Sequence, residues 1–364
     1  MKPVPPPLPG KRKKKWPVAV LGATGAVGQM FVRLLADHPW FEIAELAASE
    51  RSAGKKYGEA TRWLEGPPPP ASVQGRRVIA CDPGVVSAPI VFSALDAAIA
   101  GEVEMSFAKA GKFVLSNAKN FRMEPDVPLV IPEVNGDHLA LIGCQRTKRG
   151  WEGAIVTNAN CSATVAAVAL APLHQKFRIR QLFLSTMQAV SGAGYPGVPS
   201  LDILGNVIPY IADEEPKLER ELLKLLGTYE DGEVTSASFR VSAHTNRVAV
   251  EHGHTICMSV GFEETPTPEQ AIDAMRSWQG FPATAGLPSR PEHPLVVSDA
   301  PDRPQPKRDV YAGDGMTVTV GRVRRDAILD LRMVALGHNT VRGAAGGSVL
   351  NAELLASNGA FDSA

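Results

Sequence analysis

The sequence has no net charge and no long apolar run. Lys and Arg together number 38, as do Asp and Glu, so the formal net charge is 0. Balanced charge gives no reason to expect nucleic acid or a charged membrane as a partner. No segment approaches the roughly 18 consecutive apolar residues of a transmembrane helix, so we expect none.

Cysteine is scarce and the short motifs built on it are absent. The four cysteines, Cys81, Cys144, Cys161 and Cys257, never form a CxxC pair. This spacing argues against a disulfide framework and against a zinc site, and we expect no bound metal and a reducing, cytoplasmic location. Two of them fall in strand-like runs and Cys144 in an expected loop, so these three are interpreted as packing residues. No YxxxK occurs, which argues against a short-chain dehydrogenase.

The composition is otherwise that of a globular protein with a large core. The 364 residues are 44% hydrophobic and 21% charged, which is typical of two domains of ordinary size. Residues 1–15, "MKPVPPPLPGKRKKK", differ, being first proline-rich and then basic. No apolar segment follows them, so they do not form a secretory signal, and we expect a disordered, extended tail.

A glycine motif follows the first expected strand. Residues 18–21 form a short apolar run, followed by Gly22, Gly25 and Gly28 and then by a helical pattern that should stop near 37–39. The order strand, glycine turn, helix lets a backbone approach a pyrophosphate, which then meets the free N–H groups of the helix N-terminus. The sequence therefore predicts dinucleotide binding here, against the alternative of a turn used only for packing.

The end of the second expected strand, residues 41–49, bears on the choice of cofactor. An NAD site usually has an acid there for the ribose 2′-hydroxyl, whereas this chain has Ser49, Arg51 and Ser52. Hydroxyls and a cation suit a 2′-phosphate, so we expect NADP. Glu50 is the one residue that favours NAD instead.

The remaining pattern predicts an α/β fold. Short strands are expected at 76–83, 88–96 and 112–118, with a helix at 97–111 between two of them. This alternation predicts a Rossmann-type doubly wound parallel sheet in an NADP-binding domain over residues 16–157. Beyond it lie a helix at 161–173 and longer strand-like runs at 180–194, 233–262 and 327–337. These predict an α+β catalytic and dimerisation domain, 158–338, with a largely antiparallel or mixed sheet. The last helix, in 339–364, should return to the first domain.

Cys161 stands apart from the other cysteines in "TNANCSATVAAVALAPL". Asn160 can cap the following helix, which places Cys161 at the first helical position. The helix dipole there favours an anion and would lower the pKa of a thiol. A nucleophile is the interpretation that this favours, and a small buried apolar residue is the alternative.

A thiol nucleophile requires a proton partner, and the chain has eight histidines. His254, in "RVAVEHGHTICMSV", follows a glycine at the start of a strand and is the best candidate. His252 is its near rival, because residues two apart in a strand share a face. His174 is expected to end and cap the Cys161 helix.

Eight stretches together resemble the archaeal and fungal branch of the aspartate-semialdehyde dehydrogenases. They are "GATGAVGQ", "AASERSAGKKYGEA", "SNAKNFR", "VPLVIPEVN", "NANCSATV", "QAVSGAG", "NRVAVEHGHT" and "RGAAGGSVLNAELL", and they occur in family order across residues 16–357. The separation of Cys161 and His254 distinguishes the chain from glyceraldehyde-3-phosphate dehydrogenase relatives. One departure is Ala249, where the family usually has proline.

The resemblance assigns roles to the catalytic residues. It implies that Cys161 is the acyl-accepting thiolate, His254 the acid/base, and Gln188 the group that orients the acyl chain. The implied substrate contacts are Arg247 for the α-carboxylate, Glu214 for the amino group with Glu215 as the alternative, Lys217 and Arg122 for phosphate, and Asn160. The implied cofactor contacts are Gly22, Thr24, Gly25, Ala26, Val27, Gly28, Ser49, Arg51, Ser52, Ser93, Ser191, Gly192 and Asn339.

The implied reaction is the reduction of L-aspartyl-4-phosphate by NADPH to L-aspartate 4-semialdehyde and phosphate. The Cys161 thiolate would displace phosphate, assisted by Arg122 and Lys217, to give a thioester, and His254 would supply a proton after hydride transfer. The product would enter threonine, methionine and possibly lysine biosynthesis, and the enzyme would be a homodimer or homotetramer. Two alternatives remain: a malonyl-CoA reductase, which the paired Glu214 and Lys217 disfavour, and a non-catalytic dinucleotide-binding sensor.

Overall fold

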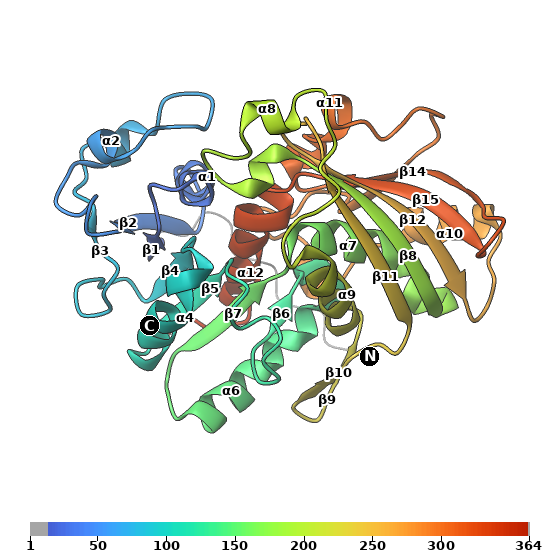
Figure 1. Ribbon diagram of the computed structural model, residues 1–364. Coiled ribbons are helices and arrows are strands. Elements are labelled where there is room, and N and C mark those ends of the chain that lie inside the picture. Colours follow the sequence, from blue (N-terminus) through green and yellow to red (C-terminus); the bar gives the residue numbers. More distant parts are fainter. Residues whose placement is uncertain (1–13, 363–364) are drawn as a thin grey trace.

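The computed structural model describes residues 14–362 and holds two large β-sheets, each with its own helices, and a separate two-stranded hairpin (Figure 1). Residues 1–13 of the expected tail lie outside the described residues. Within 14–362, none of the helices combines the length and the apolar character needed to cross a membrane.

The first sheet has the strand order β3-β2-β1-β4-β5-β7-β6, and every neighbouring pair in it is parallel. Its strands are β1 (Trp16–Leu21), β2 (Phe41–Ala48), β3 (Ile79–Ala80), β4 (Ile90–Ser93), β5 (Phe113–Ser116), β6 (Leu129–Val130) and β7 (Ala154–Asn158). Parallel strands of this kind are covered on both faces, and residues 18–21 of β1 are accordingly fully buried.

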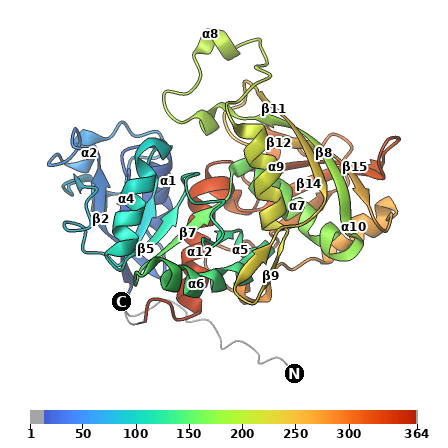
Figure 2. The ribbon, with the colours of Figure 1, turned by 60° about the horizontal axis from the view of Figure 1, so that its bottom comes forward.

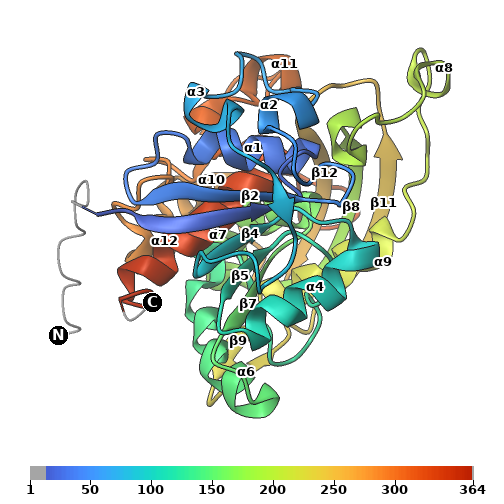
Figure 3. The same ribbon diagram turned by 90° about the vertical axis from the view of Figure 1, so that its left-hand side faces the viewer.

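Helices cover both faces of this sheet (Figure 3). On one face lie α1 (Ala26–Leu35) and α12 (Gly346–Ser357), whose side chains share a core with β1, β2 and β4. On the other face lies α4 (Ala97–Lys109), with Phe107 in a second core. The indole N–H of Trp16 donates to the Phe361 carbonyl at 3.3 Å, which joins the two ends of the described chain. The predicted doubly wound sheet and the return of the last helix to it are thus confirmed.

Shorter helices connect the strands of this half. They are α2 (Tyr57–Ala60), α3 (Ala71–Gln74), α5 (Pro132–Asn135), the 3₁₀ turn η1 (Gly136–Ala140) and α6 (Leu141–Arg149). The expectation that Cys144 lies in a loop is wrong, since Cys144 belongs to α6. This helix is short, polar and interrupted by glycine, so it shows little periodicity, and the left-handed Gly150 that ends it (φ 64°) is its clearest signal.

The second sheet has the order β11-β8-β12-β15-β14-β13 and is mixed, as expected. Its outer pairs β11/β8 and β13/β14 are parallel and the other pairs are antiparallel. Its strands are β8 (Ile179–Gln188), β11 (Arg240–Arg247), β12 (His254–Phe262), β13 (Leu295–Ser298), β14 (Val318–Arg325) and β15 (Leu331–Gly337).

One face of the second sheet carries helices and the other is open. The covering helices are α7 (Cys161–Phe177), α9 (Glu214–Leu225) and α10 (Pro268–Ser277), which share one core with the strands. On the open face Phe183 and Met187 are exposed. The helix expected at 161–173 extends four residues further, to Phe177, so His174 lies within α7 and does not end it. The His174 Nδ1 nevertheless accepts the backbone N–H of Ile179, just beyond the end of the helix.

The remaining elements are short. They are the hairpin β9 (Thr228–Glu230) and β10 (Glu233–Thr235), α8 (Ser200–Ile203), α11 (Pro306–Asp309), the 3₁₀ turns η2 (Val190–Ala193), η3 (Pro282–Thr284) and η4 (Ala312–Gly315), and the π-helix η5 (Val341–Ala345). The segment around α8 projects from the rest of the molecule (Figure 2), and Leu201 on it is 91% exposed.

Candidate active site

The start of α7 lies where the two sheets meet. Strand β7 ends at Asn158, and α7 begins three residues later at Cys161. The Asn160 side-chain oxygen accepts the N–H groups of Ser162 and Ala163 at 2.9 and 3.1 Å. Asn160 is therefore the N-cap, as predicted, and the cap places the Cys161 thiol at the first position of the helix.

His254 is the histidine that meets this thiol. Its Nε2 lies 3.1 Å from the Cys161 sulfur, although 93 residues separate the two in sequence. His254 opens β12 and is fully buried, whereas Cys161 is partly exposed. His252 points elsewhere, with its Nδ1 3.1 Å from the Ser191 hydroxyl. The structure thus separates the two candidates that the sequence left as rivals.

The electrostatic setting of Cys161 differs from the expected one. Burial raises the pKa of the Cys161 thiol to about 12, and the Glu214 carboxylate acts in the same direction. The Arg122 and Arg247 guanidinium groups and the Ser162 backbone N–H lower the pKa, but by less. The prediction of a lowered thiol pKa is therefore wrong for this structure, because desolvation outweighs the helix N-terminus.

Glu214 links the other expected substrate residues. Its Oε1 accepts hydrogen bonds from the Asn160 amide at 2.8 Å and the Gln188 amide at 3.1 Å, and its Oε2 lies 3.9 Å from Lys217 Nζ. Glu215 points away from them and accepts the Thr245 N–H of β11. Of the two adjacent acids, Glu214 is the one that lies among the candidate site residues.

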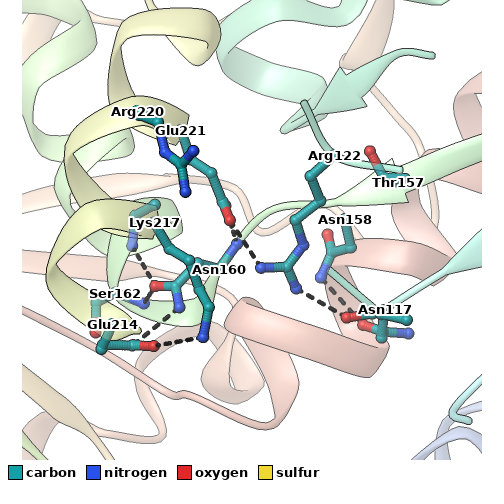
Figure 4. Close-up of polar contacts among 12 residues, drawn as sticks. Asn117, Arg122, Thr157, Asn158, Asn160, Ser162, Glu214, Lys217, Arg220 and Glu221 are labelled. Atoms are coloured by element: carbon teal, nitrogen blue, oxygen red, sulfur yellow. Dashed lines mark hydrogen bonds and ion pairs between the residues drawn. The ribbon is translucent and has the colours of Figure 1, made fainter. Parts of the chain in front are cut away.

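Arg122 is held by a residue that sequence reasoning missed (Figure 4). Its Nη1 donates to Glu221 at 2.9 Å and its Nη2 to the Asn117 carbonyl at 2.8 Å. The other oxygen of Glu221 accepts the Asn160 backbone N–H at 2.6 Å. Glu221 thus connects Arg122 to the N-cap of α7. Glu221 lies seven residues after Glu214 and so on the same face of α9, and this spacing could have identified it from the sequence.

Arg247 is a second guanidinium whose charge lowers the pKa of the Cys161 thiol. It ends β11, is 7% exposed and donates from Nη1 to the Ala189 carbonyl at 2.7 Å. Gly192 leaves room for it, since a Cβ on Gly192 would lie 3.1 Å from Arg247 Nη1 and 3.2 Å from His254 Cε1. Gly192 therefore lies against these two side chains as well as beside the expected nicotinamide position.

A second close approach involves the π-helix η5. A Cβ on Gly343 would lie 2.5 Å from the Cys161 Cβ, so only glycine allows these two segments to meet as they do. The carbonyls of Gly343 and Ala344 both accept the Asn158 side-chain amide. Gly343 was not among the predicted residues, and its position in a glycine-rich stretch after the last strand is only a weak signal.

One cavity of about 520 Å³ joins the thiol to the glycine turn. The first turn of α1 and Cys161 both line it, together with Arg122, Asn160 and Lys217. The turn has the geometry that a dinucleotide needs: Gly22 has φ 71°, and a Cβ on Gly28 would lie 2.2 Å from the Gly22 carbonyl oxygen. The turn and the close packing of the helix on the strand are thus those of a dinucleotide-binding motif.

The other predicted cofactor residues divide into two groups. Asn339 and Ser191 line the cavity beside Gly192, and the Asn339 amide donates to the Ser191 hydroxyl at 2.8 Å. The residues that do not line it are Gly22, Thr24, Gly28, Ser49, Arg51, Ser52 and Ser93. Of these, Ser49 and Arg51 are exposed just beyond β2, and Ser93 is buried at the end of β4.

Comparison with known proteins gives a consistent result over both halves. The chain matches the family models described as "Semialdehyde dehydrogenase, NAD binding domain" at residues 17–142 and "Semialdehyde dehydrogenase, dimerisation domain" at residues 170–342. It is 50% identical to aspartate-semialdehyde dehydrogenase of Archaeoglobus fulgidus, over 94% of this chain and 98% of that one. The corresponding protein of Schizosaccharomyces pombe is 48% identical, again over 94% and 98%.

The solved structures that resemble this chain carry the same name as these relatives. Aspartate semialdehyde dehydrogenase with NADP from Candida albicans has a TM-score of 0.87 and 43% identity, over 95% of this chain and 99% of that chain. Aspartate semialdehyde dehydrogenase II complexed with ASA from Vibrio cholerae has a TM-score of 0.73 and 26% identity, over 94% and 99%.

Proposed function

The chain belongs to the aspartate-semialdehyde dehydrogenase family, and we propose how its own residues carry out the family's reaction. That reaction is the NADPH-dependent reduction of L-aspartyl-4-phosphate to L-aspartate 4-semialdehyde and phosphate, a step of amino-acid biosynthesis. Neither a malonyl-CoA reductase nor a non-catalytic sensor is supported by the comparisons.

One observation carries the assignment of the site. The Cys161 sulfur, 3.1 Å from His254 Nε2, opens into the same cavity as the glycine turn. A thiol with a histidine partner suits acyl transfer, and a glycine turn at a helix N-terminus suits a dinucleotide. Cys161 is therefore the residue that we propose as the acyl acceptor.

Arg247 and Glu214 are proposed to hold the amino-acid end of the substrate. Arg247 can bind the α-carboxylate in a bidentate pair, because only Nη1 is directed at the Ala189 carbonyl. Glu214 presents a carboxylate that already accepts amide donors, and an ammonium group could join them. Gln188, which donates to Glu214, is then placed to orient the acyl chain.

Arg122 and Lys217 are proposed to bind the phosphate. The Arg122 Nε is buried and, among residues 14–362, has no hydrogen-bond partner, although the two ends of the same guanidinium are both bonded. A buried donor without an acceptor is costly unless a ligand supplies one. Lys217 lines the same cavity and adds a second positive charge.

The chemistry assigned to the chain is covalent catalysis. Attack by the Cys161 sulfur on the acyl phosphate would release phosphate toward Arg122 and Lys217 and leave a thioester, which divides one difficult reduction into two easier steps. NADPH supplies the hydride that reduces this thioester. The first turn of α1 would bind its pyrophosphate, with Ser191, Gly192 and Asn339 beside the nicotinamide.

The direct test is the reverse reaction, followed at 340 nm. Aspartate semialdehyde, phosphate and NADP should give NADPH, and the rate with NAD in place of NADP should be much lower. Malonyl-CoA with NADPH serves as the comparison substrate and should give no change in absorbance. Absence of turnover with the semialdehyde, or faster turnover with malonyl-CoA, would overturn the proposed function.

The dimerisation domain indicates a homo-oligomer. We propose that two copies pair through the open face of the second sheet, where Phe183 is 44% and Met187 36% exposed. A Phe183→Glu variant should then sediment as a smaller species than the unchanged protein. A cytoplasmic location is also proposed, supported by the four free thiols.

A further inference from the structure

Ser191 lines both the active-site cavity and a neighbouring cavity of about 380 Å³. In the first cavity it lies with Asn339, beside the position proposed for the nicotinamide. In the second it lies with His252, a histidine to which the proposed chemistry gives no role. The Ser191 hydroxyl oxygen lies 2.8 Å from the Asn339 amide nitrogen and 3.1 Å from the His252 Nδ1. The directions of these two hydrogen bonds determine what Ser191 can offer to a ligand.

The direction of the bond to Asn339 is fixed by the backbone. The Asn339 side-chain oxygen accepts the Gly253 N–H at 2.9 Å, and a backbone N–H can only donate. The amide nitrogen is therefore the end of Asn339 that meets Ser191, and the hydroxyl oxygen is the acceptor there. Asn339 is 2% exposed, so its side chain has little freedom to turn over.

The direction of the bond to His252 depends on which ring nitrogen carries hydrogen. Burial and the charge of Arg33 lower the pKa of His252 by more than the charge of Glu251 raises it, so the ring is neutral at neutral pH and has one N–H. The Glu251 carboxylate, which can only accept, lies 3.7 Å from Nε2 and favours the hydrogen there. Nδ1 then keeps its lone pair and accepts the Ser191 hydroxyl hydrogen.

The fold holds the His252 ring in this position. The ring stacks on that of His338, with the centroids 4.9 Å apart and the planes at 28°. His338 is itself fixed, since its Nδ1 accepts the backbone N–H groups of Thr340 and Val341, both at 3.3 Å. Burial is the main cause that lowers the pKa of His338 to about 3, so this neighbour adds no charge to the stack.

Gly253 lets the two histidines beside it face different sites. Its φ of 100° favours glycine, and the residues on either side of it do not share a face as they would in a regular strand. His252 turns to the hydroxyl described above, whereas His254 turns to the thiol and receives the Ala189 N–H on its other ring nitrogen. The pair therefore divides its contacts between the cofactor side and the thiol side of the cavity.

We propose that His252 is a positioning residue for the nicotinamide: its Nδ1 holds the Ser191 hydrogen, so that Ser191 presents a lone pair to the carboxamide NH2 of the cofactor. The proposal rests on the proposed function, which places the nicotinamide beside Ser191. With one bond donated to His252 and one accepted from Asn339, the hydroxyl oxygen keeps one free lone pair on the cavity wall. The NH2 is the one hydrogen-bond donor of the nicotinamide group, so the two match. Without His252, the hydroxyl hydrogen could turn into the cavity and meet the carboxamide oxygen instead.

Two cofactors that differ only at the carboxamide test this arrangement. In 3-acetylpyridine adenine dinucleotide phosphate a methyl group replaces the NH2, and the carbonyl is kept. Isothermal titration of the full chain near neutral pH should give a Kd for this analogue at least about fivefold higher than for NADP, as expected for one lost hydrogen bond. Equal Kd values would overturn the proposal alone, because they would show that Ser191 does not bind the NH2. Absence of any NADP binding would overturn the proposed cofactor site together with this proposal.

Three variants test whether His252 is the source of the discrimination. His252→Phe keeps a ring to stack on His338 but removes the acceptor, so its ratio of the two Kd values should fall to about twofold or less. His252→Asn can place a side-chain oxygen near the position of Nδ1 and should keep a ratio of at least about threefold. His293→Phe, at an exposed histidine, is the control and should match the unchanged protein.

Two results with these variants would refute the role of His252. One is a Phe variant that discriminates between the cofactors as well as the unchanged protein does. The other is an Asn variant that discriminates no better than the Phe variant. A residue that only supported the fold would change both Kd values together and leave their ratio unmoved.

Discussion

Replacing Glu221 by alanine should destabilise the protein by about 3–5 kcal/mol, the usual cost of removing one partner of a buried ion pair. The Arg122 and Glu221 side chains are only 10% and 2% exposed and lie 2.9 Å apart. Removing the carboxylate leaves the guanidinium charge buried and also strands the Asn160 N–H, which Glu221 accepts at 2.6 Å. Urea unfolding followed by circular dichroism, at one fixed protomer concentration, measures the difference.

Two further variants make this test specific. Arg122→Leu combined with Glu221→Ala removes both charges and should be less destabilised than Glu221→Ala alone, because no uncompensated charge stays buried. Arg220→Ala, at an exposed site on the same helix, should change the free energy of unfolding by no more than about 0.5 kcal/mol. Two results would refute the reasoning. One is a loss below about 1 kcal/mol for Glu221→Ala. The other is a double variant whose loss in free energy of unfolding equals the sum of the losses of Glu221→Ala and Arg122→Leu.

Three other changes test different parts of the structure. Cys161→Ser should abolish turnover at 340 nm while leaving NADP binding and circular dichroism intact, since a hydroxyl is far less acidic and less nucleophilic than a thiol; measurable turnover would show that the nucleophile lies elsewhere. Gly343→Ala brings a Cβ to 2.5 Å from the Cys161 Cβ and should lower kcat at least about tenfold, whereas Gly143→Ala, whose Cβ would meet nothing within 4 Å outside its own helix turn, should leave kcat unchanged. Burial raises the pKa of Glu104 from 4.5 to about 7, against hydrogen bonding by Ser116 and the charge of Arg122. The Glu104 carboxyl group therefore keeps its proton in the folded chain at pH values above about 4.5, where the unfolded chain loses it. The stability that this bound proton contributes is complete below about pH 4.5 and is lost as the pH rises through 7. The free energy of unfolding should therefore fall by about 3 kcal/mol between pH 4.5 and pH 7.5, as measured by urea unfolding. The unchanged protein and the exposed-site control Glu102→Gln should both show this fall, whereas Glu104→Gln should not.

Short-range patterns predicted the parts of this molecule that local chemistry determines. The glycine turn before α1 and the Asn160 cap before Cys161 both follow from residues within a few positions of each other, and both are found where expected. The expected thiol pKa failed because it considered only the helix that carries Cys161. Desolvation and the charge of Glu214 depend on segments that the fold brings in from elsewhere.

The features that sequence reasoning missed share one property: each depends on two distant segments in contact. Glu221 meets Asn160 across 61 positions, and the Ala189 N–H meets His254 across 65. Gly343 matters because its missing side chain lets η5 reach Cys161. A glycine in a glycine-rich stretch and an acid on an amphipathic helix are ordinary features of a sequence. Their roles become visible only from the contacts that the folded chain makes between distant segments.

The contact between Trp16 and Phe361 has a consequence for the order in which the protein can be made. The core beneath the first sheet includes side chains of α12, so the half that starts the chain also needs its last helix. During synthesis, the second sheet and its helices can be completed while one face of the first sheet is covered by α1 and still lacks α12. The nucleotide-binding half must therefore wait until α12 has been translated before the core on this face is complete.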